Sequence, residues 1–271
     1  MKALITDLDA TILPYGGSIC NSTLEKLEDL GKKGVVRILA TGRSLFSVKR
    51  AVTENFPIDY LVFSSGAGIM DWHDKRMLNA RHIPNIEAKE IAERLWNRRI
   101  NFMAQGEIPE NHRFYYTDIP PVHPDYTMRL DIFKEFGEYL ENPEDIEGMV
   151  SEFIVVLDTR QIRIIGEIYE LNREYSVIKT TSPHNTGALW LEIFPFGLSK
   201  GSACETLLSE LGIDIRNECA GIGNDFNDVD FLRLCRKSAV VGNAAPALRK
   251  EFQTVSEDAE GGFLEFIRNI F

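Results

Sequence analysis

The chain has 271 residues, with 44% hydrophobic and 26% charged side chains and a formal net charge of −11. This length and composition are typical of a globular protein of about two domains, with a core that needs no disulfide or metal to hold it. The acidic balance excludes a nucleic-acid partner and an anionic membrane surface, because both need a basic face. No apolar run approaches the roughly 20 residues of a membrane span. We therefore expect a cytoplasmic protein, either a monomer or a weak homo-oligomer.

The cysteines show no metal-binding or redox spacing. None of Cys20, Cys204, Cys219 and Cys235 belongs to a CxxC pair or lies at zinc-finger distance from a histidine. Their neighbours are apolar or typical of helices, so we expect all four to be buried, reduced thiols.

The first part of the chain alternates short apolar runs with amphipathic ones. Strands are predicted over residues 2–6, 35–40 and 60–65, and helices over 18–34 and 44–56. The first helix is expected to be capped near Asn21 or Ser22 and to end at a glycine. This alternation indicates βαβ units around a parallel sheet, in which ligands bind at the carboxyl ends of the strands.

The middle of the chain is irregular and the end returns to the first pattern. In the middle, strands are predicted over 101–105, 113–117, 152–158 and 188–194, and helices over 86–99 and 166–175. Towards the end, helices at 198–212, 226–235, 246–252 and 263–271 alternate with strands at 218–223 and 238–242. The predicted fold class is therefore α/β, with a Rossmann-like parallel-sheet core at 1–82 and 189–271. An α+β module at 83–188 is inserted into it.

Two carboxylates follow the first predicted strand, in the segment DLDAT. Asp7 and Asp9 are two residues apart, so their side chains can converge on one point, and such a pair needs a counter-cation such as Mg²⁺. One carboxylate could attack phosphorus while the other transfers a proton. Taken alone, the segment is more typical of a solvated acidic turn or a helix cap.

Three further segments add suitable groups at later strand ends. Thr41 in ATGR could donate to a phosphoryl oxygen, and Lys200 in GLSKG could balance the charge of a carboxylate and a phosphoryl group. Residues 223–228, GNDFND, offer carboxylates and amides for a metal. Each also has an ordinary interpretation as a turn hydroxyl, a surface cation or helix caps, but their order along the chain favours one shared site.

Taken together, these motifs resemble the haloacid dehalogenase (HAD) superfamily of aspartyl-phosphate phosphatases, and within it the Cof-type branch. The matching segments are DLDATIL, ATGR, SSGAGI, LEIFPFGLSKGSA, GIGNDFNDVDFL and AVVGNAAP. They occur in both halves of the core, so the resemblance covers the whole catalytic domain. It implies that residues 83–188 form a cap domain that selects the leaving group.

The resemblance also implies roles for individual residues. Asp7 would be the nucleophile, Asp9 the general acid and then the base for water, and Thr41 and Lys200 would position the phosphoryl group. Further substrate contacts are implied at Gly42, Arg43 and Asn227. Mg²⁺ would be held by the Asp7 carboxylate, the Asp9 main-chain carbonyl and the segment 224–228, with Asn224, Asp225 and Asp228 as candidate ligands.

The chain departs from the branch at a position that concerns the metal. The branch usually has Gly-Asp-x-x-Asn-Asp where this chain has Gly223-Asn224-Asp225-Phe226-Asn227-Asp228, so the usual ligand is replaced by the amide of Asn224. Either that amide binds through its oxygen or Asp225 takes its place, and the carboxylate is favoured by a hard dication. Ala10 and Ser65 replace a common Gly and a common Asn, and Asn243 of the GNA motif is expected to support the site.

Several polar and aromatic residues of the inserted module are candidate substrate contacts. They are His112, Arg113, Tyr115, Tyr116, His123 and His184. Each is equally typical of a surface polar group or of the module's own core. By analogy alone, the substrate is a small phosphorylated metabolite such as a sugar phosphate.

Three functions follow from these motifs. The first is Mg²⁺-dependent hydrolysis of a phosphomonoester, which makes the chain a phosphoric monoester hydrolase. The second is a phosphomutase, which would retain the phosphoryl group and release an isomerised sugar phosphate. The third is a non-catalytic phosphate-binding or regulatory protein, which the neutral Asn224 would explain.

Overall fold

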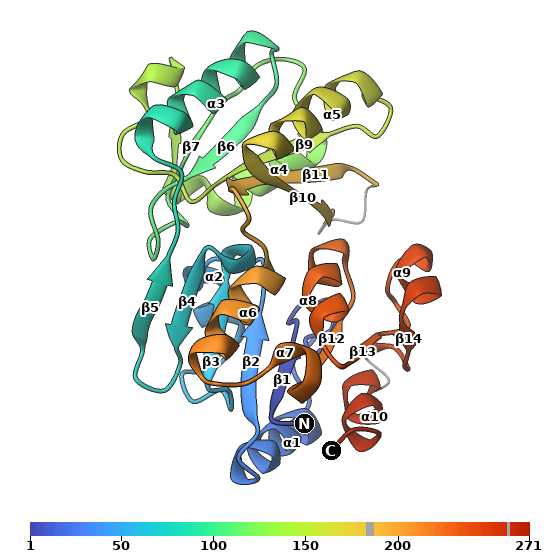
Figure 1. Ribbon diagram of the computed structural model, residues 1–271. Helices are drawn as coiled ribbons and strands as arrows, with labels where there is room; N and C mark the ends of the chain where they lie inside the picture. The colour runs from blue at the N-terminus through green and yellow to red at the C-terminus, as the bar shows by residue number, and fades with distance from the viewer. Residues whose placement is uncertain (183–186, 259–260) are drawn as a thin grey trace. The chain divides into compact units, whose positions relative to one another are not determined.

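The computed structural model describes residues 1–182, 187–258 and 261–271, arranged in two compact units (Figure 1). Unit 1 comprises Met1–Arg43, Val48–Asn79 and Ser199–Phe271, and unit 2 comprises Ser44–Ser47 and Ala80–Leu198. The sequence placed the later division at residue 189. The structure places it after Leu198, because β11 (Leu189–Pro195) pairs with strands of unit 2.

Unit 1 is built on an eight-stranded sheet in the order β14-β13-β12-β1-β2-β3-β4-β5 within the described residues. The pairs from β14 to β3 are parallel, and β3 pairs with β4 in the antiparallel sense. The strands are β1 (Ala3–Thr6), β2 (Val36–Ala40), β3 (Tyr60–Phe63), β4 (Gly68–Asp71), β5 (Arg76–Ala80), β12 (Cys219–Gly223), β13 (Lys237–Val240) and β14 (Gln253–Thr254). The predicted α/β class is confirmed.

Helices cover this sheet because each buries one apolar stripe. In α6 (Lys200–Glu210), Ala203, Cys204, Leu207 and Leu208 recur at helical spacing and join the core formed by β1, β2 and β12. The other helices that lie wholly in unit 1 are α1 (Asn21–Lys32), α7 (Ile215–Glu218), α8 (Val229–Leu234), α9 (Pro246–Glu251), α10 (Gly262–Arg268) and the short 3₁₀ turns η1 (Ser64–Gly66) and η5 (Phe226–Asp228). Helix α2 (Leu45–Ala51) begins in unit 2 and ends in unit 1.

Unit 2 has a six-stranded sheet in the order β10-β11-β9-β6-β7-β8 within the described residues. Its strands are β6 (Phe102–Gln105), β7 (Phe114–Tyr116), β8 (Gly137–Tyr139), β9 (Glu152–Leu157), β10 (Tyr175–Thr181) and β11. Helices α3 (Asn85–Asn97) and α5 (Ile162–Tyr169) lie on one face and α4 (Pro124–Phe133) on the other (Figure 1). Three further 3₁₀ turns are η2 (Lys134–Phe136), η3 (Pro143–Asp145) and η4 (Glu170–Arg173). The sequence did not predict the strands β4, β5, β8, β10 and β14 or the helices α4 and α7.

The cysteines are all free thiols. Cys204, Cys219 and Cys235 are buried as expected, but the expectation was wrong for Cys20, which is exposed because it lies in the loop directly before α1. Within the part of the chain that the structure describes, no helix combines the length and apolarity needed to cross a bilayer.

Candidate active site

The site lies at one edge of the unit 1 sheet, where three parallel strands end together. β1 is central, flanked by β12 and β2, and Thr6 at its end is in register with Ile222 and Leu39 of these neighbours. The main-chain nitrogen of Asp7 continues the ladder by donating to the Ile222 carbonyl at 3.0 Å. Because the strand order changes direction at β1, the loops that follow the three strands open around a common space.

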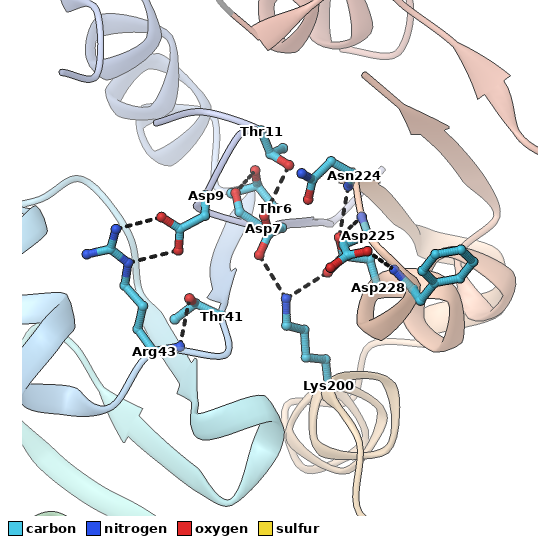
Figure 2. Close-up of polar contacts among 11 residues, drawn as sticks. Thr6, Asp7, Asp9, Thr11, Thr41, Arg43, Lys200, Asn224, Asp225 and Asp228 are labelled. Atoms are coloured by element: carbon cyan, nitrogen blue, oxygen red, sulfur yellow. Dashed lines mark hydrogen bonds and ion pairs between the residues drawn. The ribbon is translucent and has the colours of Figure 1, made fainter. Parts of the chain in front are cut away.

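Asp7 is held in a buried, fixed position at this edge (Figure 2). Asp7 is 4% exposed. Thr11 Oγ1 donates a hydrogen bond to Asp7 Oδ2 at 3.1 Å, and Lys200 Nζ donates one to Asp7 Oδ1 at 2.8 Å. Burial raises the pKa of Asp7 to about 7, with a further contribution from the negative charge of Asp228 that Lys200 partly offsets. An ionised Asp7 therefore gains from any additional cation at the site.

Lys200 is the first residue of α6 and links two loops of the site. Ser199 caps the helix by accepting from the Ser202 main-chain nitrogen, which fixes the start of α6. The buried ammonium group donates to Asp7 and, at 2.7 Å, to Asp228 Oδ1. Burial alone would lower the pKa of Lys200, but the carboxylates of Asp228 and Asp7 raise it by more, so the lysine stays charged.

Asp228 organises the loop after β12. It is fully buried, and its Oδ2 accepts hydrogen bonds from the main-chain nitrogens of Asn224 at 2.8 Å and Asp225 at 2.9 Å. The Asp225 carboxylate accepts from the Phe226 nitrogen at 2.8 Å and caps η5. Asp228 is thus engaged by Lys200 and by its own loop.

Asp9 forms a two-pronged ion pair with Arg43 at the edge of the site. Arg43 Nε and Nη2 donate to the two carboxylate oxygens at 2.8 and 2.6 Å. The hydrogen bond to Asp9 is the main reason that the pKa of Arg43 is raised. The guanidinium group of Arg43 thus engages both carboxylate oxygens of Asp9.

The loop after β2 brings neutral polar groups to the same edge. Thr41 is fully buried and its Oγ1 accepts from the Arg43 nitrogen at 3.2 Å, which leaves its O–H free to donate. A Cβ added to Gly42 would lie 3.6 Å from Asn227 Nδ2, so the Asn227 amide lies beside the Gly42 backbone. The structure thus brings Thr41, Gly42 and Asn227 together.

The charge of the site suits a divalent cation. The carboxylates of Asp7, Asp9, Asp225 and Asp228 lie around the cations Lys200 and Arg43 (Figure 2). No three His, Cys, Asp or Glu side chains of the described residues converge closely enough to form a metal site alone. Mg²⁺ keeps several waters and needs only one or two protein carboxylates beside substrate oxygens, so this donor set fits it.

The side chains of Asn224 and Asp225, the two candidate metal ligands of the loop after β12, differ in their surroundings. The Asp225 carboxylate is used as a cap, whereas the Asn224 side chain projects towards the loop of Thr11 in Figure 2. Both Asn224 and Asp225 remain candidate metal ligands beside Asp7 and the Asp9 carbonyl.

A family model described as haloacid dehalogenase-like hydrolase matches residues 4–267. The chain belongs to the haloacid dehalogenase-like hydrolases. The superfamily, the fold class and the expected enzyme class, a phosphoric monoester hydrolase, are thereby confirmed.

Similar proteins to this HAD-like hydrolase are phosphatases by name. A phosphatase of Bacillus subtilis strain 168 named for 5-amino-6-(5-phospho-D-ribitylamino)uracil is 21% identical over 99% of this chain and 95% of its own. The HMP-PP phosphatase of Citrobacter koseri is 22% identical, over 92% of this chain and 87% of its own. Among solved structures, the HAD subclass IIB sugar phosphatase BT4131 superposes with a TM-score of 0.77 at 18% identity, covering 99% and 98% of the two chains.

Two residues of this HAD-like hydrolase support the first loop. Asn243 Nδ2 donates to the Ala10 carbonyl at 3.1 Å, in line with the supporting role expected for the GNA motif. Ala10 has a φ of 52°, the left-handed conformation that the Gly common at this position adopts more easily. Thr11, whose contact fixes Asp7, was missed as a functional residue, although the T of DLDAT pointed to it.

The candidate substrate contacts of the inserted module belong to unit 2. Tyr115 and Tyr116 are neighbours on β7 and pack into the cores on opposite faces of the sheet. His123 caps α4, its Nδ1 accepting from the Asp125 nitrogen at 3.2 Å. His112 is largely buried, which lowers its pKa, and Arg113 is exposed. His184 lies outside the described residues.

Gly66 is required for the position of Lys200. Its φ is +107°, and an added Cβ would lie 2.5 Å from the carbonyl oxygen of Ser199, the residue that caps α6. We expect Gly66→Ala to lower the free energy of unfolding by about 2–4 kcal/mol, through backbone strain and overpacking. Urea denaturation measures this loss.

Gly212→Ala is the matched control for that substitution. Gly212 has a φ of +69° but no atom within 4 Å of the added Cβ, so only the strain of about 1–2 kcal/mol applies. If Gly66→Ala and Gly212→Ala lowered the free energy of unfolding equally, the steric role of Gly66 would be contradicted.

Proposed function

We propose that the protein is a Mg²⁺-dependent phosphatase that hydrolyses a small phosphorylated metabolite through a phospho-aspartate on Asp7. The observation that carries the proposal is the contact of the buried Asp7 carboxylate with Lys200 and Thr11 at the end of the central strand. These contacts hold the nucleophile in one rotamer, which is the condition for in-line attack on phosphorus. The relatives named as metabolite phosphatases support the same reaction class.

The first step forms one bond and breaks one. A carboxylate oxygen of Asp7 bonds to phosphorus while the bond from phosphorus to the leaving alcohol oxygen breaks. Asp9, released from Arg43 and protonated, gives its proton to that oxygen, and Thr41 donates to a phosphoryl oxygen. Lys200 stabilises the negative charge that Asp7 and the phosphoryl group bring together.

The second step returns the enzyme to its starting state. A water molecule loses a proton to the carboxylate of Asp9 and attacks phosphorus, and the bond to the Asp7 oxygen breaks. Inorganic phosphate leaves and Asp7 is a carboxylate again. Bound Mg²⁺, held by Asp7, the Asp9 carbonyl and the loop at 224–225, would polarise the phosphoryl group.

The proposal is tested with purified protein and an aryl phosphate. We expect phosphate release with Mg²⁺ and a loss of at least about 100-fold after chelation, restored by added Mg²⁺, because the metal contributes several kcal/mol to the barrier. In a parallel assay with a sugar phosphate as substrate, isomerised sugar phosphate without free phosphate would show a phosphomutase instead. Saturable phosphate binding without turnover at any Mg²⁺ concentration would show a regulatory protein.

Two variants separate the candidate metal ligands. If the Asn224 amide binds the metal, Asn224→Asp should lower the Mg²⁺ concentration for half-maximal activity by about tenfold, since a carboxylate binds the cation more tightly. If Asp225 is the ligand, Asp225→Asn should raise that concentration by a similar factor while preserving the cap of η5. Mg²⁺ titrations of both variants measure the difference.

A cytoplasmic location and a monomeric or weakly associating state remain predictions.

A further inference from the structure

A surface pocket lies within unit 2, between α3 and the segment that α5 and η4 form. Its volume is about 320 Å³, which is at the lower end of the range of pockets that bind small ligands. The residues that line it come from α3, from the turn after α3, and from residues 167–174. None of the residues assigned to the candidate active site is among them.

The floor of the pocket is apolar. It is formed by Leu95, Ile100, Ile168 and Leu171, which belong to the core on this face of the sheet and are 2–8% exposed. Because core side chains pack closely and hold fixed positions, this floor keeps its shape without a ligand. It offers an apolar surface to the side of a ligand that carries no polar group.

The rim of the pocket carries three cations and three anions, namely Arg94, Arg98, Arg173, Glu167, Glu170 and Glu174. Four of them form ion pairs across the pocket. Arg98 Nε donates to Glu167 Oε2 at 2.8 Å, and Arg94 Nη1 donates to Glu174 Oε2 at 3.4 Å. The first pair joins α3 to α5, and the second joins α3 to the residue that follows η4.

Glu170 and Arg173 are the two rim residues outside these pairs. Both are exposed, and neither side chain forms a hydrogen bond or an ion pair with any residue of the described ranges 1–182, 187–258 and 261–271. They are the first and last residues of η4, and side chains three residues apart in a 3₁₀ turn lie above one another. A free carboxylate and a free guanidinium group therefore lie on one side of this turn, beside the apolar floor.

These charges favour a ligand that carries both signs. A purely anionic ligand is repelled by the carboxylate of Glu170, and a purely cationic ligand is repelled by the guanidinium group of Arg173. An uncharged ligand would take water from both groups without replacing it by an ionic partner. A zwitterion supplies a partner of opposite sign to each group, and an apolar α-amino acid adds a side chain that suits the floor.

We propose that this pocket binds a free α-amino acid with an apolar side chain. The carboxylate of the amino acid accepts hydrogen bonds from Arg173, and its ammonium group donates to Glu170. Its side chain lies on the apolar floor. This binding site is separate from the proposed phosphatase reaction, because no group that takes part in that reaction lines the pocket.

Isothermal titration calorimetry on the full chain tests the proposal, with L-leucine and L-phenylalanine as probes. We expect saturable binding of at least one of them. Three compounds that each lack one group of L-leucine should bind at least about tenfold more weakly. L-Leucinamide lacks the carboxylate, 4-methylpentanoate lacks the ammonium group, and glycine lacks the apolar side chain.

Two variants test the charged partners. Glu170→Gln and Arg173→Gln should each raise the Kd of the amino acid by at least about tenfold, because each removes one ionic hydrogen bond. Both side chains are exposed, so both variants should keep the wild-type Tm without ligand. The matched control is Arg160→Gln, which should keep the wild-type Kd, since the Arg160 side chain is 88% exposed in the same unit and does not line the pocket.

The proposal is overturned if neither amino acid binds at millimolar concentration, or if either variant retains the wild-type Kd. It is also overturned if glycine binds as tightly as L-leucine, or if 4-methylpentanoate does, which would show a pocket for organic anions. Calorimetry needs no turnover, so a failure to release phosphate from an aryl phosphate would refute the proposed function alone.

Discussion

Replacing Asp7 by Asn should reduce phosphate release by at least about 10³-fold, because the amide cannot form the bond to phosphorus. The variant keeps the size of the side chain, and its amide oxygen can still accept from Thr11 or Lys200. The loss should therefore appear in kcat, while saturation by substrate remains measurable. Steady-state kinetics on an aryl phosphate, with mass spectrometry of the trapped phosphoenzyme, check both points.

Stability measurements separate this chemical loss from unfolding. The pKa of Asp7 is raised to about 7 from a usual value of 3.8, so the folded chain holds an extra proton between these values and loses stability as the pH rises through them. Asn carries no charge, and the variant should match or exceed the wild-type Tm above pH 7 without Mg²⁺. Wild-type activity in Asp7→Asn would contradict the mechanism, and a lowered Tm would indicate misfolding.

Replacing Lys200 by Met should lower the free energy of unfolding by about 3–5 kcal/mol, because Asp7 and Asp228 would be left as buried charges without a counter-ion. Lys200 is 1% exposed and donates to both carboxylates. The expected fall in Tm is roughly 10 °C. Activity should fall as well, since the charge next to the phosphoryl group is lost. Thermal unfolding and urea denaturation at neutral pH measure the effect.

Two comparisons make the Lys200 result specific. Lys32→Met removes a lysine that is 72% exposed and lies 3.4 Å from Asp29, and it should change stability by less than about 0.5 kcal/mol. Adding Asp228→Asn to Lys200→Met should recover part of the loss, because one unpaired charge is removed. If the double variant lost more free energy of unfolding than the two single variants lose together, the charge explanation would fail.

The sequence was most informative where the chemistry is local. The segments around Asp7, Thr41 and Asp228 each follow a buried apolar run, and parallel strands bring such ends to one edge, so their meeting could be predicted without coordinates. Lys200 could be included because it opens a helix, and the structure shows it in contact with Asp7 and Asp228. Helix α1 (Asn21–Lys32) was predicted from its apolar spacing, but its N-cap is Cys20 and not Asn21 or Ser22.

What the sequence could not show depends on contacts between distant residues. The pairing of Asp9 with Arg43 is set by the fold of two separate loops, and no spacing rule links them. The sequence of β11 is a buried apolar run, which is typical of a strand in either sheet. Its pairing with β9 and β10 in the structure assigns it to unit 2. Helix α4 was missed because it is only weakly amphipathic and follows a proline-rich segment.

The position of β1 has a consequence for the order in which the chain folds. Its neighbour β12 lies more than two hundred residues further along, and Lys2 donates to the carbonyl of Glu218 at 2.7 Å. During synthesis from the N-terminus, the first strand must wait with one edge unpaired until the last quarter of the chain emerges. Unit 2, whose strands all arise between residues 102 and 195, is complete by then and can fold first. The loops of the candidate active site are therefore among the last parts of the molecule to acquire their final arrangement.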